Sequence, residues 1–93
     1  MTKNENGLSN PELLEIRRRC ESATAGPWKS FVEGRDHTSG SSFIRTGSGE
    51  NRGKDMELSG ASIADQDFIA QAREDIPRLL EEIARLKRCI VED

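Results

Sequence analysis

The sequence is poor in aromatic residues, contains no tyrosine, and has hydrophobic side chains at only 33% of its 93 positions. A chain this short forms one domain at most, and so little apolar material leaves it a thin core. Small domains with thin cores usually gain stability from disulfides, a bound metal or self-association. We therefore expect a single domain spanning residues 1–93 that forms a homo-oligomer, either a dimer or a larger assembly.

Cysteine and histidine are equally scarce, with Cys20, Cys89 and His37 as their sole representatives. No CxxC spacing, secretory signal or long apolar run is visible, so we expect a cytoplasmic protein with free thiols and no membrane partner. The spacing of these residues matches neither a set of metal ligands nor a histidine–serine dyad. We predict no metal, no cofactor and no enzyme activity.

Charge is distributed unevenly within a formal net charge of −3. Residues 29–54 hold five cationic and three anionic side chains, and the surplus of acid lies in the flanking segments. A protein that binds a nucleic-acid duplex usually carries a much stronger basic stripe. This balance favours a small anionic ligand at the middle of the chain and argues against duplex binding.

The first part of the sequence predicts a flexible tail over residues 1–8 and a helix over residues 9–25. Ser9 can cap the helix, Pro11 suits its first turn, and Glu12 stands at the capping-box spacing from Ser9. Gly26-Pro27 is a stop signal for this helix. The basic run at residues 17–19 is expected to be a solvated face, although one of its arginines is placed to reach a ligand held at the sheet.

The middle of the sequence, residues 28–58, predicts a small antiparallel β-meander with connecting loops. Residues 28–32 and 42–46 are short runs of aromatic and β-branched residues, which favour strands. Residues 56–58 are a candidate third strand. A glycine-rich loop precedes them, and it lacks the Ser or Thr that follows the lysine of a nucleotide-hydrolysing P-loop, because Asp55 stands there.

The last part predicts a long helix over residues 62–91, which completes an α+β fold. Ser62 or Asp65 can cap it, and Pro77 predicts a kink or a break. Its apolar face is expected to begin at Phe68, Ile69 and Ala72. The later apolar positions follow the alternating 3-and-4 spacing of a coiled-coil seam: Ile76, Leu79, Ile83, Leu86 and Ile90. Core packing and a dimer seam both explain this stripe, and helix faces serve the core first.

The middle segment also contains residue types that suit an anionic, base-containing ligand. Backbone amides at Gly47 and Gly49 can approach a phosphate closely, and arginine guanidinium groups form paired bonds to its oxygens. The predicted ligand-binding residues are Trp28, Phe43, Arg45, Gly47, Gly49, Asn51, Arg52 and Arg73. For Trp28 and Phe31 we favour the alternative that they belong to the core. For the polar residues, a solvated loop that binds no ligand is an equal alternative.

Two stretches resemble signatures of small phage-encoded proteins. Residues 20–28 resemble C-x-x-A-T-x-G-P-W, and residues 67–83 resemble D-x-F-I-A-x-A-R-x-D-I-P-x-L-L-x-E-I. Within that group the chain resembles the phage Thoeris anti-defence family, the first described of the cyclic-nucleotide sponges. The same signatures also occur in phage accessory proteins of unsettled function.

The resemblance implies a helix, a small antiparallel sheet and a long C-terminal helix that assemble into dimers and higher oligomers. It also implies sequestration of cyclic ADP-ribose isomers or cyclic di- or trinucleotides, without cleavage, in the cytoplasm of the infected bacterial host. Trp28, Asp67 and Arg73 lie in the matched motifs, although a salt bridge to Asp75 or Glu74 explains Arg73 equally well. The alternative function is a protein–protein interaction module that acts on a host factor through residues 76–90.

Overall fold

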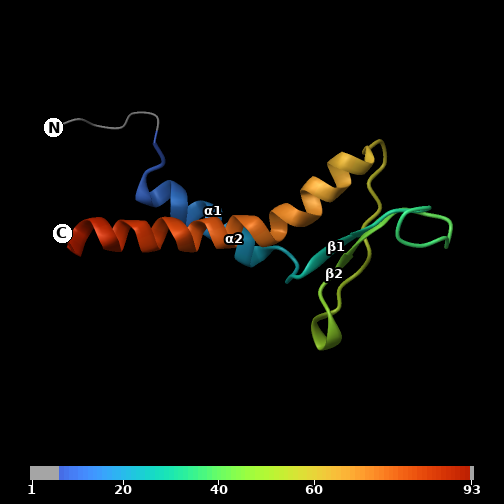
Figure 1. Ribbon diagram of the computed structural model, residues 1–93. Helices are drawn as coiled ribbons and strands as arrows, with labels where there is room; N and C mark the ends of the chain where they lie inside the picture. Colours follow the sequence, from blue (N-terminus) through green and yellow to red (C-terminus); the bar gives the residue numbers. More distant parts are fainter. Residues whose placement is uncertain (1–6, 93) are drawn as a thin grey trace.

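The computed structural model describes residues 7–92, so residues 1–6 of the predicted tail and Asp93 lie outside the described residues. The elements are α1 (Asn10–Ser22), β1 (Trp28–Phe31), β2 (Phe43–Thr46), the 3-10 helix η1 (Gly49–Asn51) and α2 (Ile63–Glu92). This order confirms the predicted α+β fold. The molecule measures 57 × 29 × 20 Å, because α2 runs beside the sheet and then continues beside α1 (Figure 1).

Helix α1 begins with the predicted capping box. The Ser9 hydroxyl accepts a hydrogen bond from the backbone N–H of Glu12 at 3.2 Å, and the Glu12 carboxylate accepts one from the N–H of Ser9 at 2.7 Å. The helix ends at Ser22, before the predicted end at Ala25, and Ala23 is already extended. The prediction placed the end too late because the carbonyl of Thr24 has donors outside the helix, at Trp28 and Arg73.

Strands β1 and β2 form a two-stranded antiparallel sheet in which Trp28 lies opposite Thr46 and Phe31 lies opposite Phe43. The predicted third strand is wrong. Met56 alone pairs with Ile44, through two backbone hydrogen bonds of 2.7 and 2.8 Å. The chain then turns at residues 59–60 to reach α2, so residues 57–58 have no room to extend the pairing.

The core lies mainly between the sheet and the first half of α2. Val32, Ile44 and Ala70 are buried there, and Leu80 is the buried hydrophobic residue between α1 and α2. Gln66 is also buried, with only 5% of its surface exposed. Its side-chain amide lies within hydrogen-bond distance of the Ser30 hydroxyl (2.8 Å) and of the carbonyl oxygens of Phe31 and Phe43 (3.2 Å each), so it joins α2 to both strands.

Helix α2 begins with a second reciprocal cap, in which Ser62 and Asp65 exchange side-chain and backbone hydrogen bonds of 3.0 and 3.2 Å. It continues through Pro77 without a break. Figure 1 shows the helix changing direction in its orange part, near Pro77. Proline lacks the amide hydrogen that would bond to the preceding turn, which explains the predicted kink.

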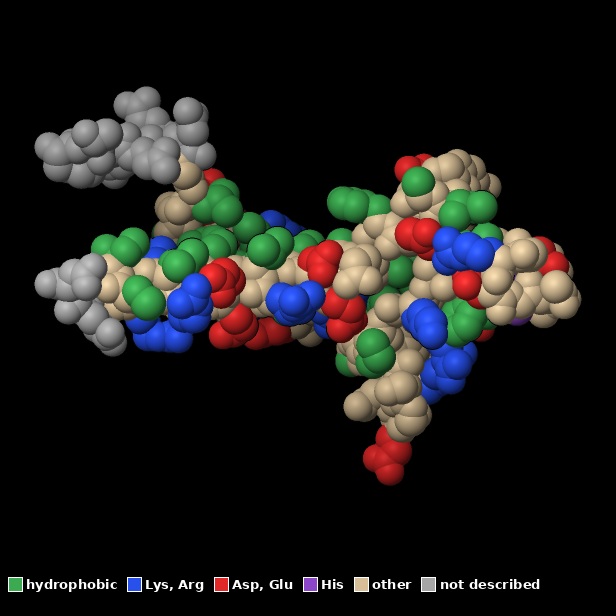
Figure 2. Space-filling view, in the orientation of Figure 1, with side chains coloured by type: hydrophobic (Ala, Val, Ile, Leu, Met, Phe, Trp, Pro, Cys, Tyr) green, Lys and Arg blue, Asp and Glu red, His purple; other side chains and the backbone are tan. Residues whose placement is uncertain are grey.

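The prediction that Phe68 begins the apolar face of α2 is wrong. Phe68 is 74% exposed, whereas Gln66 and Ala70, one turn apart, face the sheet. The coiled-coil seam is also largely uncovered: Ile76, Leu79, Leu86 and Ile90 are exposed. Figure 2 shows hydrophobic side chains along one edge of α2. The core therefore uses Leu80, beside the seam, and leaves most of the seam itself at the surface.

Candidate functional site

The two signature segments, residues 20–28 and 67–83, meet where α1 ends. The carbonyl oxygen of Thr24 accepts hydrogen bonds from the Trp28 indole N–H at 3.1 Å and from the Arg73 guanidinium at 3.0 Å. The Glu74 carboxylate accepts one from the backbone N–H of Trp28 at 3.2 Å. Gly26 permits this approach, since a Cβ there would lie 2.7 Å from the Glu74 carboxylate.

A pocket of about 240 Å³ lies beside this junction, and we call it the Trp28 pocket. Its lining comes from α1, β1 and α2: Ile16, Arg19, Cys20, Ala23, Trp28, Ile69, Ala72, Arg73 and Ile76. The guanidinium carbon of Arg73 lies 5.9 Å from the centre of the Trp28 ring, which is within cation–π range. The pocket thus combines an indole, two guanidinium groups and an apolar floor.

Arg19 and Arg73 differ in how they are held at the Trp28 pocket. Arg73 is half-buried and fixed by its bond to Thr24. The alternative of a salt bridge is not realised in the part of the chain that the structure describes, where Asp75 pairs with Arg78 at 3.6 Å. Arg19 is exposed and forms no ion pair with any described residue. The sequence indicated Arg19 only as one of the three arginines of the basic run at residues 17–19.

The glycine-rich loop uses its backbone amides to hold itself together. Gly47 donates to the carbonyl of Pro27 at 2.8 Å, and Gly53 donates to the carbonyl of Thr46 at 2.8 Å. The amides of Asn51 and Arg52 also bond within the loop. Gly47 has a φ of 69°, and a Cβ there would lie 1.9 Å from the carbonyl oxygen of Asn51. The loop is therefore a closed turn whose base lies against the first signature.

Arg52 is directed into the same loop. Its guanidinium donates to the carbonyl oxygens of Thr46 and Gly53 and forms an ion pair with Asp55 at 2.8 Å. Through these contacts the Arg52 guanidinium holds the turn around η1 closed. Asn51 and Gly49 lie at the exposed end of the turn. The loop residues are thus grouped together, but away from the floor of the Trp28 pocket.

Phe43 and Arg45 lie on the outer face of the sheet, opposite the face that contacts α2. Their neighbours there are Lys29 and Phe31, since Lys29 lies opposite Arg45 in the register. Phe31 stacks on Phe43 with ring centres 5.4 Å apart, so Phe31 is not the core residue that we expected. Lys29 lies 5.4 Å above the Phe31 ring. The predicted site residues therefore divide among the outer face, the loop and the Trp28 pocket.

His37 packs at the edge of this outer face, 5.2 Å from the Phe43 ring. Ser39 contacts its Nδ1 atom through the hydroxyl at 2.6 Å and through the backbone N–H at 3.0 Å. Glu33 approaches the same nitrogen at 3.6 Å. In a serine–histidine–acid triad the two partners occupy different ring nitrogens. This geometry cannot relay a proton from Ser39 through the ring to Glu33.

Asp67, which lies in the second of the two signatures, forms a two-pronged ion pair with Arg35 at 2.8 and 3.1 Å. Arg35 also contacts Asp36 at 2.9 Å. The Arg35 hydrogen bonds, with help from Ser30, lower the pKa of Asp67 to about 2, and the Arg35 contact also lowers the pKa of Asp36. Arg35 is a partner that the sequence did not indicate, because it lies 32 positions from Asp67.

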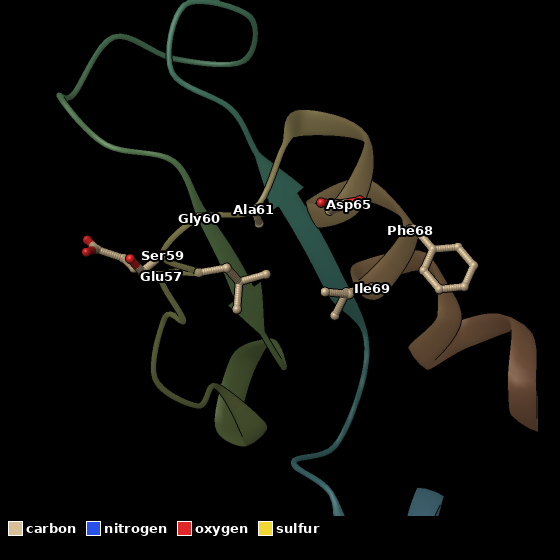
Figure 3. A pocket seen from close by; sticks show the side chains of 8 residues that line it. Glu57, Ser59, Gly60, Ala61, Asp65, Phe68 and Ile69 are labelled. Carbon is tan, nitrogen blue, oxygen red and sulfur yellow. The ribbon is translucent and has the colours of Figure 1, made fainter.

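A wider groove lies next to the Trp28 pocket along α2, between the start of that helix and the turn that leads into it, and Ile69 lines both. Figure 3 shows this groove, with Ile69 among the side chains that line it. Two carboxylates, Glu57 and Asp65, lie at this groove, and no cation lines it. An anionic ligand therefore suits the Trp28 pocket better than this groove.

Comparison of the chain with family models, with curated proteins and with solved structures gives no match. Across residues 7–92, no helix is long and apolar enough to cross a membrane. The same residues contain no group of three or more histidine, cysteine, aspartate or glutamate side chains that is arranged to hold a metal ion.

Proposed function

We propose that this protein is a non-catalytic binding module that sequesters a small cyclic nucleotide, and that it acts as a phage anti-defence sponge in the cytoplasm of the infected bacterium. The supporting observation is the Trp28 pocket, where an indole and two arginines meet. Residues of both signature segments build this pocket. The proposed ligands are cyclic ADP-ribose isomers and cyclic di- or trinucleotides, which combine flat bases with anionic phosphates.

Each part of the pocket suits one part of such a ligand. The Trp28 ring and the apolar floor suit a base, because stacking on an aromatic face contributes about 1–3 kcal/mol per base. Arg19 and the outer nitrogens of Arg73 suit phosphate oxygens. Since Thr24 fixes Arg73 beforehand, little side-chain entropy is lost when a phosphate binds. A volume of about 240 Å³ has room for a base and part of its sugar, so the rest of a cyclic ligand would lie outside.

The other predicted residues take different parts in this proposal. Phe43 and Arg45 form a second, outer contact surface for the exposed part of a ligand or for another ligand. Arg52, Asn51, Gly47 and Gly49 act indirectly, because their loop packs on the first signature: a Cβ at Gly53 would lie 2.9 Å from the Thr24 side chain. The proposed centre of binding thus moves from the middle segment to the junction of the two signatures.

Ligand release after denaturation tests the function directly. The protein is incubated with a panel of cyclic nucleotides, excess ligand is removed, and the ligand released by heating is identified by mass spectrometry. An intact cyclic nucleotide supports the sponge. A processed product would assign an enzyme instead, and no binding across the panel at micromolar protein would overturn the proposal.

Two neighbouring arginines of α1 provide a matched test of the pocket. Arg19 lines the Trp28 pocket, whereas Arg18 is exposed and does not. We expect Arg19→Gln to weaken binding about tenfold or more, because it removes a charge-assisted bond, and Arg18→Gln to leave the dissociation constant nearly unchanged. Equal effects in isothermal titration calorimetry would show that the pocket is not the site. Arg45→Gln tests the outer face in the same assay.

A further inference from the structure

The groove between residues 57–61 and the start of α2, which we call the Phe68 groove, exposes apolar side chains that the core does not use. Its volume is about 630 Å³, and Phe68 and Ile69 on its helical wall are 74% and 38% exposed. Figure 3 shows residues 57–61 along one side of the groove and α2 along the other. Apolar surface of this kind marks an interaction site, and aromatic residues are enriched where proteins bind one another.

The wall opposite α2 is a turn that is fixed without a partner. The Leu58 carbonyl accepts a hydrogen bond from the N–H of Ala61 at 3.4 Å, and Gly60 has a φ of 83°. Glycine favours this left-handed conformation at the third position of a turn. The reciprocal cap between Ser62 and Asp65 follows directly and holds the start of α2. Because both walls are formed in advance, little ordering is needed when a partner binds.

One rim of the Phe68 groove is an unpaired edge of the sheet. Met56 directs both of its backbone groups at Ile44, with hydrogen bonds of 2.7 and 2.8 Å. Backbone groups alternate in direction along an extended segment, so the N–H and C=O groups of Asp55 and Glu57 point away from β2. No described residue forms a hydrogen bond with these groups. An edge of this kind is a template for an extended chain that adds as a further strand.

Charge indicates which extended chain suits this edge. Glu57 forms no ion pair with any described residue, and Asp65 uses one carboxylate oxygen in the cap of α2. Their neighbours in the sequence, Asp55 and Asp67, are instead paired with arginines. Among the described residues that line the groove there is no lysine or arginine. A basic side chain of a partner would therefore meet a carboxylate that has no cation of its own.

The pleat of the edge sets the order of side chains in the partner. Met56 lies opposite the buried Ile44, so its side chain is on the face that contacts α2 and the side chain of Glu57 is on the outer face. In Figure 3 the Glu57 carboxylate points away from α2. A strand that adds here would place alternate side chains in the groove and beside Glu57. Apolar side chains suit the first position and basic side chains suit the second.

We infer that the Phe68 groove binds an extended segment of a partner protein in which basic and apolar residues alternate. The segment adds antiparallel to residues 55–57, which continues the order of the existing sheet. Its apolar side chains lie against Phe68 and Ile69, and a basic side chain lies beside Glu57. The inference concerns a partner protein and does not depend on the proposed ligand of the Trp28 pocket.

Synthetic peptides of alternating lysine and leucine provide the probe. We expect a labelled peptide of this pattern to bind the full chain with a dissociation constant of about 10–100 µM in fluorescence anisotropy, because a short edge offers few backbone hydrogen bonds. A peptide of alternating glutamate and leucine with the same length should bind at least about tenfold more weakly. Equal affinities, or no binding of the lysine peptide at about 1 mM protein, would overturn the inference.

Methylated backbone nitrogens test whether the peptide adds as a strand. In antiparallel addition the residue opposite Glu57 exchanges both backbone hydrogen bonds with it, and this residue is a lysine of the probe. Methylation of the lysine amides should therefore weaken binding about tenfold or more, whereas methylation of the leucine amides should change the dissociation constant less than about threefold. Equal effects, or the opposite result, would contradict antiparallel addition at this edge.

Two pairs of exposed residues test the position of the site. Phe68→Ala should weaken binding of the lysine–leucine peptide about tenfold, whereas Leu79→Ala, on the same helix but outside the groove, should not. Glu57→Gln should weaken it about threefold, whereas Glu50→Gln, at an exposed acid of η1, should not. Equal effects within either pair would show that the peptide binds elsewhere. Ile69 stays unchanged, because it lines both the groove and the Trp28 pocket.

Sedimentation distinguishes a partner protein from a second copy of this chain at the Phe68 groove. We expect the parent protein and Phe68→Ala to sediment alike, with the same helix content in circular dichroism. A smaller assembly for Phe68→Ala would show that another copy covers the groove, and that result would overturn the inference.

Discussion

The sheet end and the helical end of this molecule use apolar residues in different ways. The sheet end, which comprises β1, β2 and α2 up to Pro77, contains the buried residues Val32, Ile44 and Ala70. The helical end, which comprises α1 and the rest of α2, buries Leu80 and exposes three other large apolar side chains of α2: Leu79, Leu86 and Ile90. A sheet and a helix enclose a core between two surfaces, whereas two helices meet along a line.

The two ends also differ in the contacts that hold them together. At the sheet end, Gln66 reaches both strands and Arg35 holds Asp67 with two hydrogen bonds. At the helical end, the ion pair between α1 and α2 is the exposed contact of Arg17 with Glu81 at 3.3 Å. The comparison teaches that long-range polar contacts hold the sheet end together, whereas the helical end depends mainly on the packing of Leu80 between two helices.

Truncating a buried and an exposed residue gives the largest expected difference between the two ends. Ile44 is fully buried, so Ile44→Ala should lower the free energy of unfolding by about 2–5 kcal/mol. Leu86→Ala at the helical end should cost less than about 1 kcal/mol, because Leu86 is exposed. Urea denaturation measures both. Equal losses would show that the two ends are equally well packed.

Removing the glutamine amide is expected to have the next largest effect. Gln66→Met keeps the size of the side chain but leaves the carbonyl groups of Phe31 and Phe43 without this donor, which should cost about 1–3 kcal/mol. Gln71→Met is the matched control, since Gln71 is exposed and bonds only to Asp75 of its own helix. Thermal unfolding of the two variants compares them, and a control as damaging as Gln66→Met would contradict the specific role of Gln66.

The two ion pairs should show the smallest difference. The pKa of Asp67 is lowered from 3.8 to about 2 in the folded protein, so its contribution to stability is complete above about pH 4 and is lost as the pH falls toward 2. Asp67→Asn should remove this dependence, whereas Glu81→Gln should leave the profile unchanged over that range. Unfolding followed between pH 2 and pH 5 tests this, and identical profiles for Asp67→Asn and the parent protein would contradict it.

The local signals in the sequence predicted most of the fold correctly. Both helix starts have the side-chain caps expected at Ser9 and Ser62, and both predicted strands of the sheet form. The alternation of strand side chains also contained information that our core prediction missed. Trp28 and Phe31 are three positions apart on one strand, so their side chains point to opposite faces of the sheet.

Contacts between distant segments account for what the sequence did not predict. The end of α1 depends on donors from Trp28 and Arg73, and the burial of Gln66 depends on backbone carbonyls of both strands. Nothing in the residues around Gln66 distinguishes it from an exposed glutamine. For the candidate site, Trp28 and Arg73 of the two signatures lie together, and the spacing alone could not show that Arg45 lies on the opposite face.

The buried amide of Gln66 has a consequence for the rotation of α2 about its own axis. Successive residues of an α-helix are about 100° apart, so fixing the direction of one side chain sets the azimuth of every other. With Gln66 directed at the strands, Leu79 and Leu86 are exposed rather than turned toward α1. A single polar side chain near the start of the helix thus determines which side chains face the solvent at the other end of the helix.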